Sequence, residues 1–477
     1  MRLAFWGLAV CALYAQVISE WAFEGPDHRL HYRPDTRGNT FIDFSFAGYR
    51  AGGVRLPSPA AAQRLSPAPG DNTARIQAAL DHANGAVVLA SGEYEVAGTL
   101  HITRGGVLLR GERGAVIRLT GTPHRFLEIC GAGAWHEDAP PVAIVDDYVP
   151  AGYTAFHVRD GSAFQPGDHV LVLRPVTAEW LKFVGLDKTQ SAIHVGSVIR
   201  TDRVIDTVEG NRIMLEIPLS EPLDSRYTSA SLVRYSFPGR ITEVGVEGLR
   251  IVASFQGVGT EPALFLDAVE DGWIRDLDIQ DTQNGIAIGP TAKCLTVANV
   301  RISHSPSQPV SDPPADFALQ GTQILVDRCR VAGHGTWPVV TDSGAVGPIV
   351  VLNFTADHGG VSPREPWATG LLVDAGRFPG ATERNPGVSF YNRSAGSAGG
   401  WAIAWSVAWN VTSPFFLVPQ PPGALNWCVG CIGAPVAMYG VPNGILDSPG
   451  KMVEPPNLYL HQLRDRIGPD ALKNIGY

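Results

Sequence analysis

The stretch TADHGGVSPREPWATG, residues 355–370, brings together side chains that can do chemistry. It follows the apolar run GPIVVLNF and carries Asp357, His358, Arg364, Glu365 and Trp367 among glycines and prolines. Binding and catalytic residues are concentrated on loops that a rigid scaffold positions. We therefore expect function in this loop. The alternative is that it only links two strands.

One reaction that these residue types allow is β-elimination on a uronate chain. A cation neutralises the carboxylate and acidifies the neighbouring proton, and a base then removes that proton. Arg364 is the candidate neutralising group and His358 the candidate base. A Ca²⁺ ion held by Asp342, Asp357 and Asp374 is an alternative source of the positive charge, because Ca²⁺ prefers oxygen ligands.

Glycoside hydrolysis is the second reaction, and it needs two carboxylates that flank the scissile bond. Asp342, Asp357, Glu365 and Asp374 supply enough acids, although spacing along the chain does not measure their separation. Binding without catalysis is the third alternative. The candidate substrate-binding residues are Trp367, Asp374, Asn392, Arg393 and Trp401.

Each candidate also has a structural interpretation that the sequence leaves open. Asp342 in TDSG is typical of a turn residue, and His358 beside two glycines is compatible with a loop histidine. The tryptophans near the C-terminal end are compatible with core filling. Asn392 and Arg393 lie in YNRSAGSAGG, a composition that linkers share.

Charge and composition narrow the partners. The chain has 477 residues and a formal net charge of −9, without a block of basic residues, which argues against nucleic-acid binding. Nearly all of its 37 basic residues are arginines, which suit bidentate recognition of carboxylates, and chance composition explains the same bias. The composition is therefore compatible with an acidic ligand and argues against a nucleic-acid partner, and no apolar run after the N-terminus is long enough for a membrane helix.

The N-terminus predicts secretion. In MRLAFWGLAVCALYAQVISEWAF, one arginine precedes an apolar run that is short for a membrane span and typical of a signal peptide, with cleavage expected after Ser19. Five cysteines follow, an odd number that predicts no disulfide framework. For the pair in NWCVGCIG we expect buried thiols, because residues three apart in a strand point to opposite faces.

A repeat in the second half of the chain predicts the architecture. The pattern of VEGLRI at Val246 returns at Ile274, Val297, Val326 and Val351, with spacings of 28, 23, 29 and 25 residues. Each unit resembles a short alternating strand that cannot bury its apolar face alone. Stacked units of this length predict a parallel β-helix, a solenoid with three short strands in each turn.

The rest of the chain divides around this solenoid. We predict a signal peptide over residues 1–19, an N-terminal cap and first coils over 20–139, and a small β-rich insertion over 140–238. The main β-helix follows over 239–447, with a C-terminal cap over 448–477. A helix beginning near Asp71 or Asn72 and a second one from Leu458 are the expected capping helices.

A family resemblance supports this division. The passage DNTARIQAAL, followed by GAVVLASGEYEV and GVLLRGE, resembles the opening of the pectate-lyase-like right-handed β-helix superfamily, and with the repeats it covers most of residues 40–450. Members include rhamnogalacturonases, epimerases, polysaccharide lyases and phage tailspikes. The resemblance implies an all-β, right-handed parallel β-helix, and it does not select among these chemistries.

A narrower resemblance concerns motifs in the second half. PWATGLLVD, YNRSAGSAGGW and PPGALNWCVGCIG are similar to a subgroup of secreted bacterial β-helix proteins. That subgroup carries PHxRW and GSGHGW, where this chain has Arg364, Pro366 and Gly399. We predict a secreted polysaccharide lyase acting on uronic-acid-containing chains. A glycoside hydrolase on the same face and a non-catalytic polysaccharide-binding relative are the alternatives.

Overall fold

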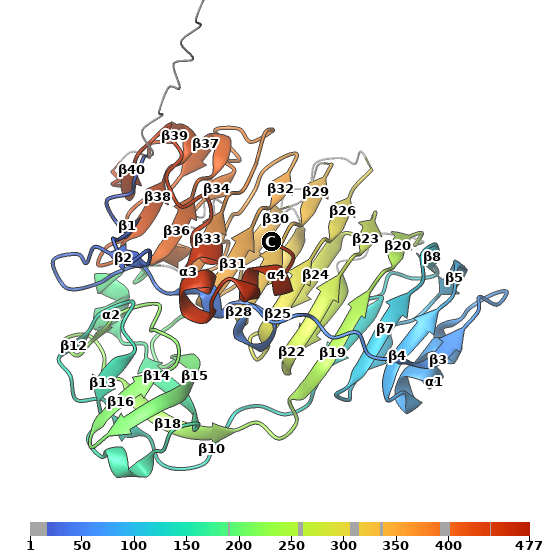
Figure 1. The fold of residues 1–477 in the computed structure, drawn as a ribbon, viewed down its shortest axis with the longest axis horizontal. Coiled ribbons are helices and arrows are strands. Elements are labelled where there is room, and N and C mark those ends of the chain that lie inside the picture. Colours follow the sequence, from blue (N-terminus) through green and yellow to red (C-terminus); the bar gives the residue numbers. More distant parts are fainter. Residues whose placement is uncertain are drawn as a thin grey trace, which may run out of the picture.

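The computed structural model describes residues 17–188, 191–255, 261–305, 314–333, 337–391, 401–438 and 440–477. Three parallel sheets run along the long axis of the molecule (Figure 1). Sheet 1 contains β3 (Ala61–Leu65), β4 (Gly85–Leu89), β7 (Val107–Gly111), β19 (Ile241–Glu247), β22 (Val269–Arg275), β25 (Lys293–Ala298), β28 (Thr322–Asp327), β31 (Val346–Leu352), β33 (Ala368–Asp374), β35 (Ile403–Ala404), β36 (Ser406–Trp409), β38 (Asn426–Val429) and β40 (Ile445–Asp447).

The other two sheets are shorter. Sheet 2 contains β5 (Gly92–Val96), β8 (Ala115–Leu119), β20 (Arg250–Ala253), β23 (Asp278–Gln280), β26 (Arg301–Ser303), β29 (Arg330–Ala332) and β32 (Thr355–Ala356). Sheet 3 contains β6 (Leu100–Ile102), β9 (Leu127–Cys130), β21 (Pro262–Asp267), β24 (Asn284–Ile288), β27 (Ala315–Leu319) and β30 (Trp337–Thr341). A small parallel sheet of β34 (Val388–Ser389), β37 (Thr412–Leu417) and β39 (Ile432–Pro435) follows near the C-terminal end.

The chain visits the three sheets in turn, so each coil lies on the previous one. Val246 pairs with Ile274, and the same ladder continues through Val297, Val326 and Val351. These are the apolar positions that open each sequence repeat. Stacking in register buries them in one continuous core. The predicted parallel β-helix is confirmed.

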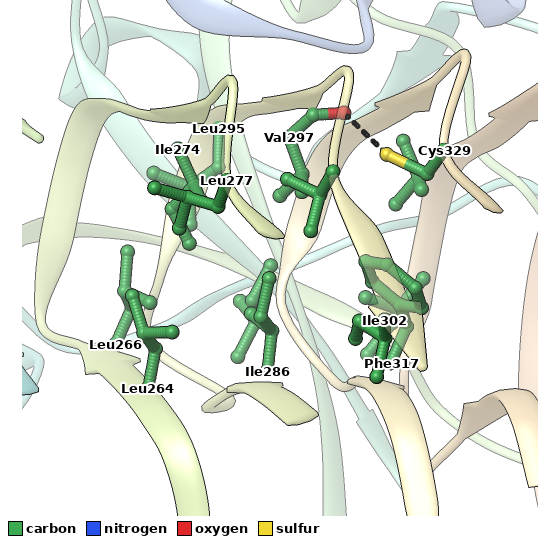
Figure 2. Packing of buried hydrophobic residues seen from close by; sticks show 14 of the residues in the cluster. Leu264, Leu266, Ile274, Leu277, Ile286, Leu295, Val297, Ile302, Phe317 and Cys329 are labelled. Atoms are coloured by element: carbon green, nitrogen blue, oxygen red, sulfur yellow. Dashed lines mark hydrogen bonds between the residues drawn. The ribbon is translucent and has the colours of Figure 1, made fainter. Parts of the chain in front are cut away.

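The core is a column of aliphatic and aromatic side chains between the sheets. Figure 2 shows Leu264, Ile286 and Phe317 from three successive coils, with Cys329 donating to the Val297 carbonyl oxygen at 3.6 Å. Full burial of one such side chain contributes about 1.5–3 kcal/mol. Because every coil adds several of them, the solenoid is stabilised along its whole length.

The repeated six-residue unit is a corner and not a single strand. In VEGLRI, β19 ends at Glu247, Gly248 has a φ of +72°, and β20 begins at Arg250. Asp276, Asn299 and Asn353 hold the same corner position in later coils, with φ near +55°. The left-handed region is open mainly to Gly, Asn and Asp, which explains the small or polar third position of the repeat. The interpretation of each unit as one alternating strand was wrong.

Helices and the chain ends cover the solenoid. Helix α1 (Thr73–His82) buries Ile76, Ala79 and Leu80 against the first coils. Helices α3 (Leu458–Ile467) and α4 (Asp470–Asn474) lie across sheet 1 (Figure 1), beside the short helices η1 (Phe44–Phe46) and η2 (Tyr49–Ala51). The N-terminal hairpin of β1 (Ala22–Glu24) and β2 (Leu30–Tyr32) packs near the last coils. In the part of the chain that is described, no helix is long and apolar enough to cross a bilayer.

The insertion leaves the solenoid after β9 and returns at β19. Its elements are β10 (His136–Glu137), β11 (Val142–Ala143), β12 (Tyr148–Val149), β13 (Ala155–His157), η3 (Gly161–Ala163), β14 (His169–Pro175), α2 (Ala178–Phe183), β15 (Val198–Glu209), β16 (Arg212–Leu215), β17 (Leu223–Asp224) and β18 (Ser231–Ser236). All of its strand pairings are antiparallel among the described residues, and it has a separate apolar core around Phe156, Val172 and Ile213. It lies beside the solenoid (Figure 1).

Cys428 and Cys431 are joined by a disulfide, which corrects the prediction of two buried thiols. The prediction assumed one continuous strand. In the structure β38 ends at Val429, Gly430 turns the chain with a φ of +66°, and both sulfur atoms therefore point into the coil. Cys130, Cys294 and Cys329 are free thiols.

Candidate functional site

The turns that lead from sheet 3 to sheet 1 carry a row of polar side chains. Leu319 pairs with Thr341, Val339 with Val361, and Val361 with Val388. Extending this register places Gln320, Asp342, Arg364 and Tyr391 on four successive coils, which are about 4.8 Å apart. We call these four residues the turn strip. Two of them, Asp342 and Arg364, were predicted from the sequence.

Asp342 and Arg364 form an ion pair across adjacent coils. Arg364 Nε donates to Asp342 Oδ1 at 2.9 Å, and the two side chains are 39% and 26% exposed, respectively. Both groups are therefore held by the backbone ladder and remain accessible to a ligand. A partly exposed ion pair of this kind contributes little to the stability of the fold. A role in ligand binding is therefore argued from its position on the surface and not from its contribution to stability.

The insertion faces the turn strip. A Cβ placed on Gly344 would lie 3.6 Å from Ile193 of the insertion. One placed on Gly185 would lie 3.2 Å from Trp401 Nε1 and 3.2 Å from Pro422. Between the insertion and the coil turns lies a pocket of about 240 Å³, lined in part by Gln320 and Ser343. The insertion therefore forms one wall of this pocket, next to Gln320 of the turn strip.

A buried charge cluster fixes this wall to the solenoid. Asp202 of β15 accepts hydrogen bonds from Lys293 Nζ at 3.2 Å, from Arg240 Nη2 at 3.1 Å and from Tyr235 Oη at 2.7 Å. Burial disfavours the charged carboxylate, but Lys293 and Arg240 outweigh this effect, so the pKa of Asp202 is lowered. Because Lys293 belongs to β25, the cluster locks the insertion against the coils beside the pocket.

Asp357 and His358 lie at the other end of sheet 3. Asp357 Oδ1 accepts from Arg330 Nη2 at 2.9 Å, and the exposed His358 ring lies beside Gly380 of the next coil. Val361 to Arg364 is paired, extended chain, which spans about 10 Å. The predicted base His358 and the predicted neutralising group Arg364 are therefore not brought to one sugar ring.

Trp367 and Asp374 lie inside the molecule. The Trp367 side chain is 2% exposed and packs edge-on against Trp180 of the insertion. Asp374 is fully buried and accepts from the Tyr459 backbone N–H at 2.8 Å, at the start of α3. Burial raises the pKa of Asp374 to about 7. Neither side chain offers a surface to a polysaccharide in this structure.

The remaining predicted residues have different positions. Trp401 is half-buried beside the insertion and packs edge-on against Tyr391 at 5.1 Å, so it borders the turn strip. Asn392 and Arg393 lie outside the described residues. The three aspartates proposed for Ca²⁺ do not converge, because Asp374 is buried under α3 while Asp342 and Asp357 lie at opposite ends of sheet 3. Across the described ranges, no group of three or more His, Cys, Asp or Glu side chains could hold a metal ion.

Several residues beside the strip were missed by sequence reasoning. Gln320 and Tyr391 enter the row because of coil register, which a single sequence does not reveal. Glu221 of the insertion accepts from Trp367 Nε1 at 3.2 Å and from Arg174 Nη2 at 2.8 Å. The surrounding sequence, LSEPLD, contains no signal for this contact.

No family model and no curated protein match this chain. Among solved structures, it is similar to the Gp54 tailspike of Acinetobacter baumannii bacteriophage AP22, in complex with capsular saccharide, at 11% identity. That match covers 76% of this chain and 51% of the tailspike, with a TM-score of 0.42. The tailspike gp49 of Pseudomonas phage LKA1 matches at 15% identity over 75% of this chain and 57% of that one, with a TM-score of 0.38.

An iota-carrageenase complexed to iota-carrageenan fragments is also similar, at 9% identity. The match covers 79% of this chain and 59% of the carrageenase, with a TM-score of 0.32. This chain thus matches little more than half the length of these three structures. The assignment to the pectate-lyase-like superfamily stays a prediction, and the fold rests on the strand pairing described above.

Proposed function

We propose that this protein acts on an acidic polysaccharide, which it binds along the turn strip and cleaves by β-elimination. The observation that carries the proposal is the ion pair of Arg364 and Asp342. It is partly exposed and is held on a rigid ladder, and the pocket beside the insertion begins at the neighbouring residues Gln320 and Ser343. Arginine is the side chain best suited to bidentate binding of a carboxylate.

In this proposal Arg364 binds the substrate carboxylate and withdraws charge from it. Asp342, at 2.9 Å from Arg364 Nε, is close enough to that carboxylate to accept the proton from the adjacent carbon. The C–H electron pair forms the new double bond, and the bond to the glycosidic oxygen breaks. Solvent water supplies the proton that the departing oxygen takes up. Asp357 and His358 would contact a different sugar unit, because they lie at the other end of sheet 3.

The test is incubation of the purified chain with polygalacturonate, alginate and hyaluronan, with Ca²⁺ or with a chelator. Elimination produces an unsaturated uronate that absorbs in the ultraviolet. Arg364→Ala should lower the rate by about 100-fold, the usual cost of removing one electrostatic stabiliser of the transition state. Arg364→Lys keeps the charge without the bidentate geometry and should retain part of the rate.

Two other outcomes would replace this proposal. New reducing ends without ultraviolet absorbance would indicate a hydrolase, in which Asp342 and Glu365 are the first carboxylates to substitute. Saturable binding that depends on Arg364, without either product, would indicate a polysaccharide-binding protein. Activity that is unchanged in Arg364→Ala and Asp342→Asn would place the site elsewhere.

A further inference from the structure

A second cavity lies on the same edge of the solenoid, closer to its C-terminal end. It has a volume of about 720 Å³, within the range of small-molecule sites. Three separate parts of the chain form it: the N-terminal segment over residues 20–39, the insertion and the last coils. We call it the end cleft. Of the predicted site residues that the structure describes, none lines it.

Aromatic side chains line the end cleft. Trp21 comes from the N-terminal segment, Tyr148 and Phe183 from the insertion, and Trp405 from the coils. The Trp405 side chain is almost completely buried. Its φ of +55° is shared by Glu243, Asp271, Cys294 and Gln323, which hold the same position in earlier coils, so this backbone conformation belongs to the solenoid and not to the cleft. Aromatic walls around a polar opening suit the apolar faces of sugar rings.

Arg37 presents a prepositioned positive charge in the end cleft. Its guanidinium lies over the Tyr148 ring at 3.7 Å, and its Nη2 donates to Asp224 Oδ2 at 2.8 Å. Arg226 also binds Asp224, through Nε at 2.9 Å and Nη2 at 2.7 Å. Because one carboxylate is shared by two guanidinium groups, this cluster keeps a net positive charge.

The charged residues that line the cleft balance in formal charge, because Glu20 and Asp35 stand beside Arg33 and Arg37. Asp35 accepts hydrogen bonds from the backbone N–H groups of Arg37 and Asn39, at 2.8 and 2.9 Å, and Glu20 pairs with Arg33 at 3.3 Å, both of them exposed. Binding of a carboxylate here therefore depends on the guanidinium of Arg37 itself and not on a net positive charge of the cleft. The side chain of Arg37 remains 38% exposed. It is therefore available to a carboxylate that enters the cleft.

The position of the end cleft relates it to the turn strip. The turn that contains Gln420 and Leu425 precedes β38, whereas Arg364 precedes β33, and β36 lies between these two strands. Two coil spacings separate the two places, which is about 10 Å. A linear chain bound at Arg364 would therefore reach the cleft within a few sugar units.

We infer that the end cleft is a second saccharide-binding site, which takes a carboxylate-bearing sugar on Arg37 with its ring against the aromatic walls. This inference rests on the acidic-polysaccharide function proposed above, but not on cleavage. It makes the N-terminal segment and the insertion parts of the binding surface rather than packing alone.

Isothermal titration calorimetry with short probes tests the end cleft separately from the strip. The probes are trigalacturonate, trimannuronate and a hyaluronan tetrasaccharide, with maltotriose as the neutral comparison. At least one acidic probe should bind, and Arg37→Ala should weaken it by about tenfold or more, which corresponds to one charge-assisted contact. Thr36→Trp places an indole at the exposed rim of the cleft and should abolish binding without removing any core contact.

Two further variants locate the binding. Arg55→Ala removes an exposed arginine outside the cleft and should leave the affinity unchanged. Arg364→Ala should remove only binding at the turn strip and should leave the binding that depends on Arg37 in place. The inference is overturned if no acidic probe binds, if Arg37→Ala and Thr36→Trp bind like the parent, or if Arg364→Ala alone removes binding. Equal affinity for maltotriose would overturn carboxylate recognition.

Discussion

The indole of Trp367 donates a hydrogen bond to Glu221 Oε2 at 3.2 Å, which joins the loop after β32 to the insertion. Glu221 is also paired with Arg174, at 2.8 Å, and both of these charged side chains are almost completely buried. The loop that the sequence singled out is therefore anchored by its tryptophan, while its arginine reaches the surface. Because the buried Trp367 lies only three residues after the exposed Arg364, it helps to hold Arg364 in place beside Asp342.

Trp367→Phe should destabilise the protein by about 1–2 kcal/mol. The variant keeps an aromatic ring but removes the indole N–H that donates to the buried carboxylate of Glu221. Urea unfolding followed by circular dichroism measures this change. Trp401→Phe, at a half-buried position, is the matched control and should cost less. Equal losses in the two variants would contradict a specific role for the indole N–H.

The ion pair of the turn strip should behave differently from the buried pair. A double-mutant cycle on Asp342 and Arg364 should give a coupling of about 0.2–1 kcal/mol, as is usual for exposed pairs. A large coupling at the strip would mean that its two residues serve stability, and the proposed function would lose its main support.

The buried pair of Glu221 and Arg174 should matter more for stability. Removing Glu221 alone, by Glu221→Gln, should cost about 3–5 kcal/mol, because Arg174 is then left buried without its partner.

Much of the fold could be predicted because the solenoid repeats a local rule. The apolar ladder that begins at Val246 is visible in the sequence, since each coil must bury the same position. The residue types at the corner position are also visible in the sequence. The reason for them is the backbone conformation, because small or polar residues recur where φ is positive. The disulfide of Cys428 and Cys431 was missed for the same reason, since Gly430 turns a chain that looks like one strand.

The candidate site could be predicted only in part. Arg364 and Asp342 were identified by residue type, and their contact depends on which coils are neighbours. Asp374 has the same chemistry, but α3 returns from far along the chain to cover it. Arg37 and Trp405 are almost 370 residues apart, and nothing in either local sequence indicates that they line one cleft. Long-range packing therefore decides which polar residues are exposed.

The corner rule gives a stability prediction at Ala375, which has a φ of +52°. Ala375→Gly should stabilise the protein by about 0.5–1 kcal/mol, because relief of the left-handed strain exceeds the added entropy of the unfolded chain. Thermal unfolding of the two proteins tests this expectation. Ala408→Gly, in the buried strand β36, is the comparison and should be destabilising. A loss of stability in Ala375→Gly would contradict the corner explanation.

Asp374 should make stability depend on pH in an unusual direction. Its pKa is raised by burial to about 7, so between its unfolded and folded pKa values the native state binds more protons than the unfolded state. The stability that protonation of Asp374 contributes is therefore fully present below about pH 4 and is lost as the pH rises through 7. Over that window the loss is up to about 4 kcal/mol.

Asp374→Asn keeps an acceptor for the Tyr459 N–H and removes the titration. Urea unfolding from pH 2 to pH 8 should show the variant gaining stability relative to the parent as the pH rises above 4. Asp224→Asn provides a contrast of opposite sign, because hydrogen bonds from Arg226 and Arg37 overcome desolvation and lower the pKa of Asp224 to about 2. Its contribution is present above pH 4 and disappears as the pH falls through 2. If the Asp374→Asn difference does not change with pH, Asp374 is charged beneath α3, and the helix N-terminus outweighs its burial.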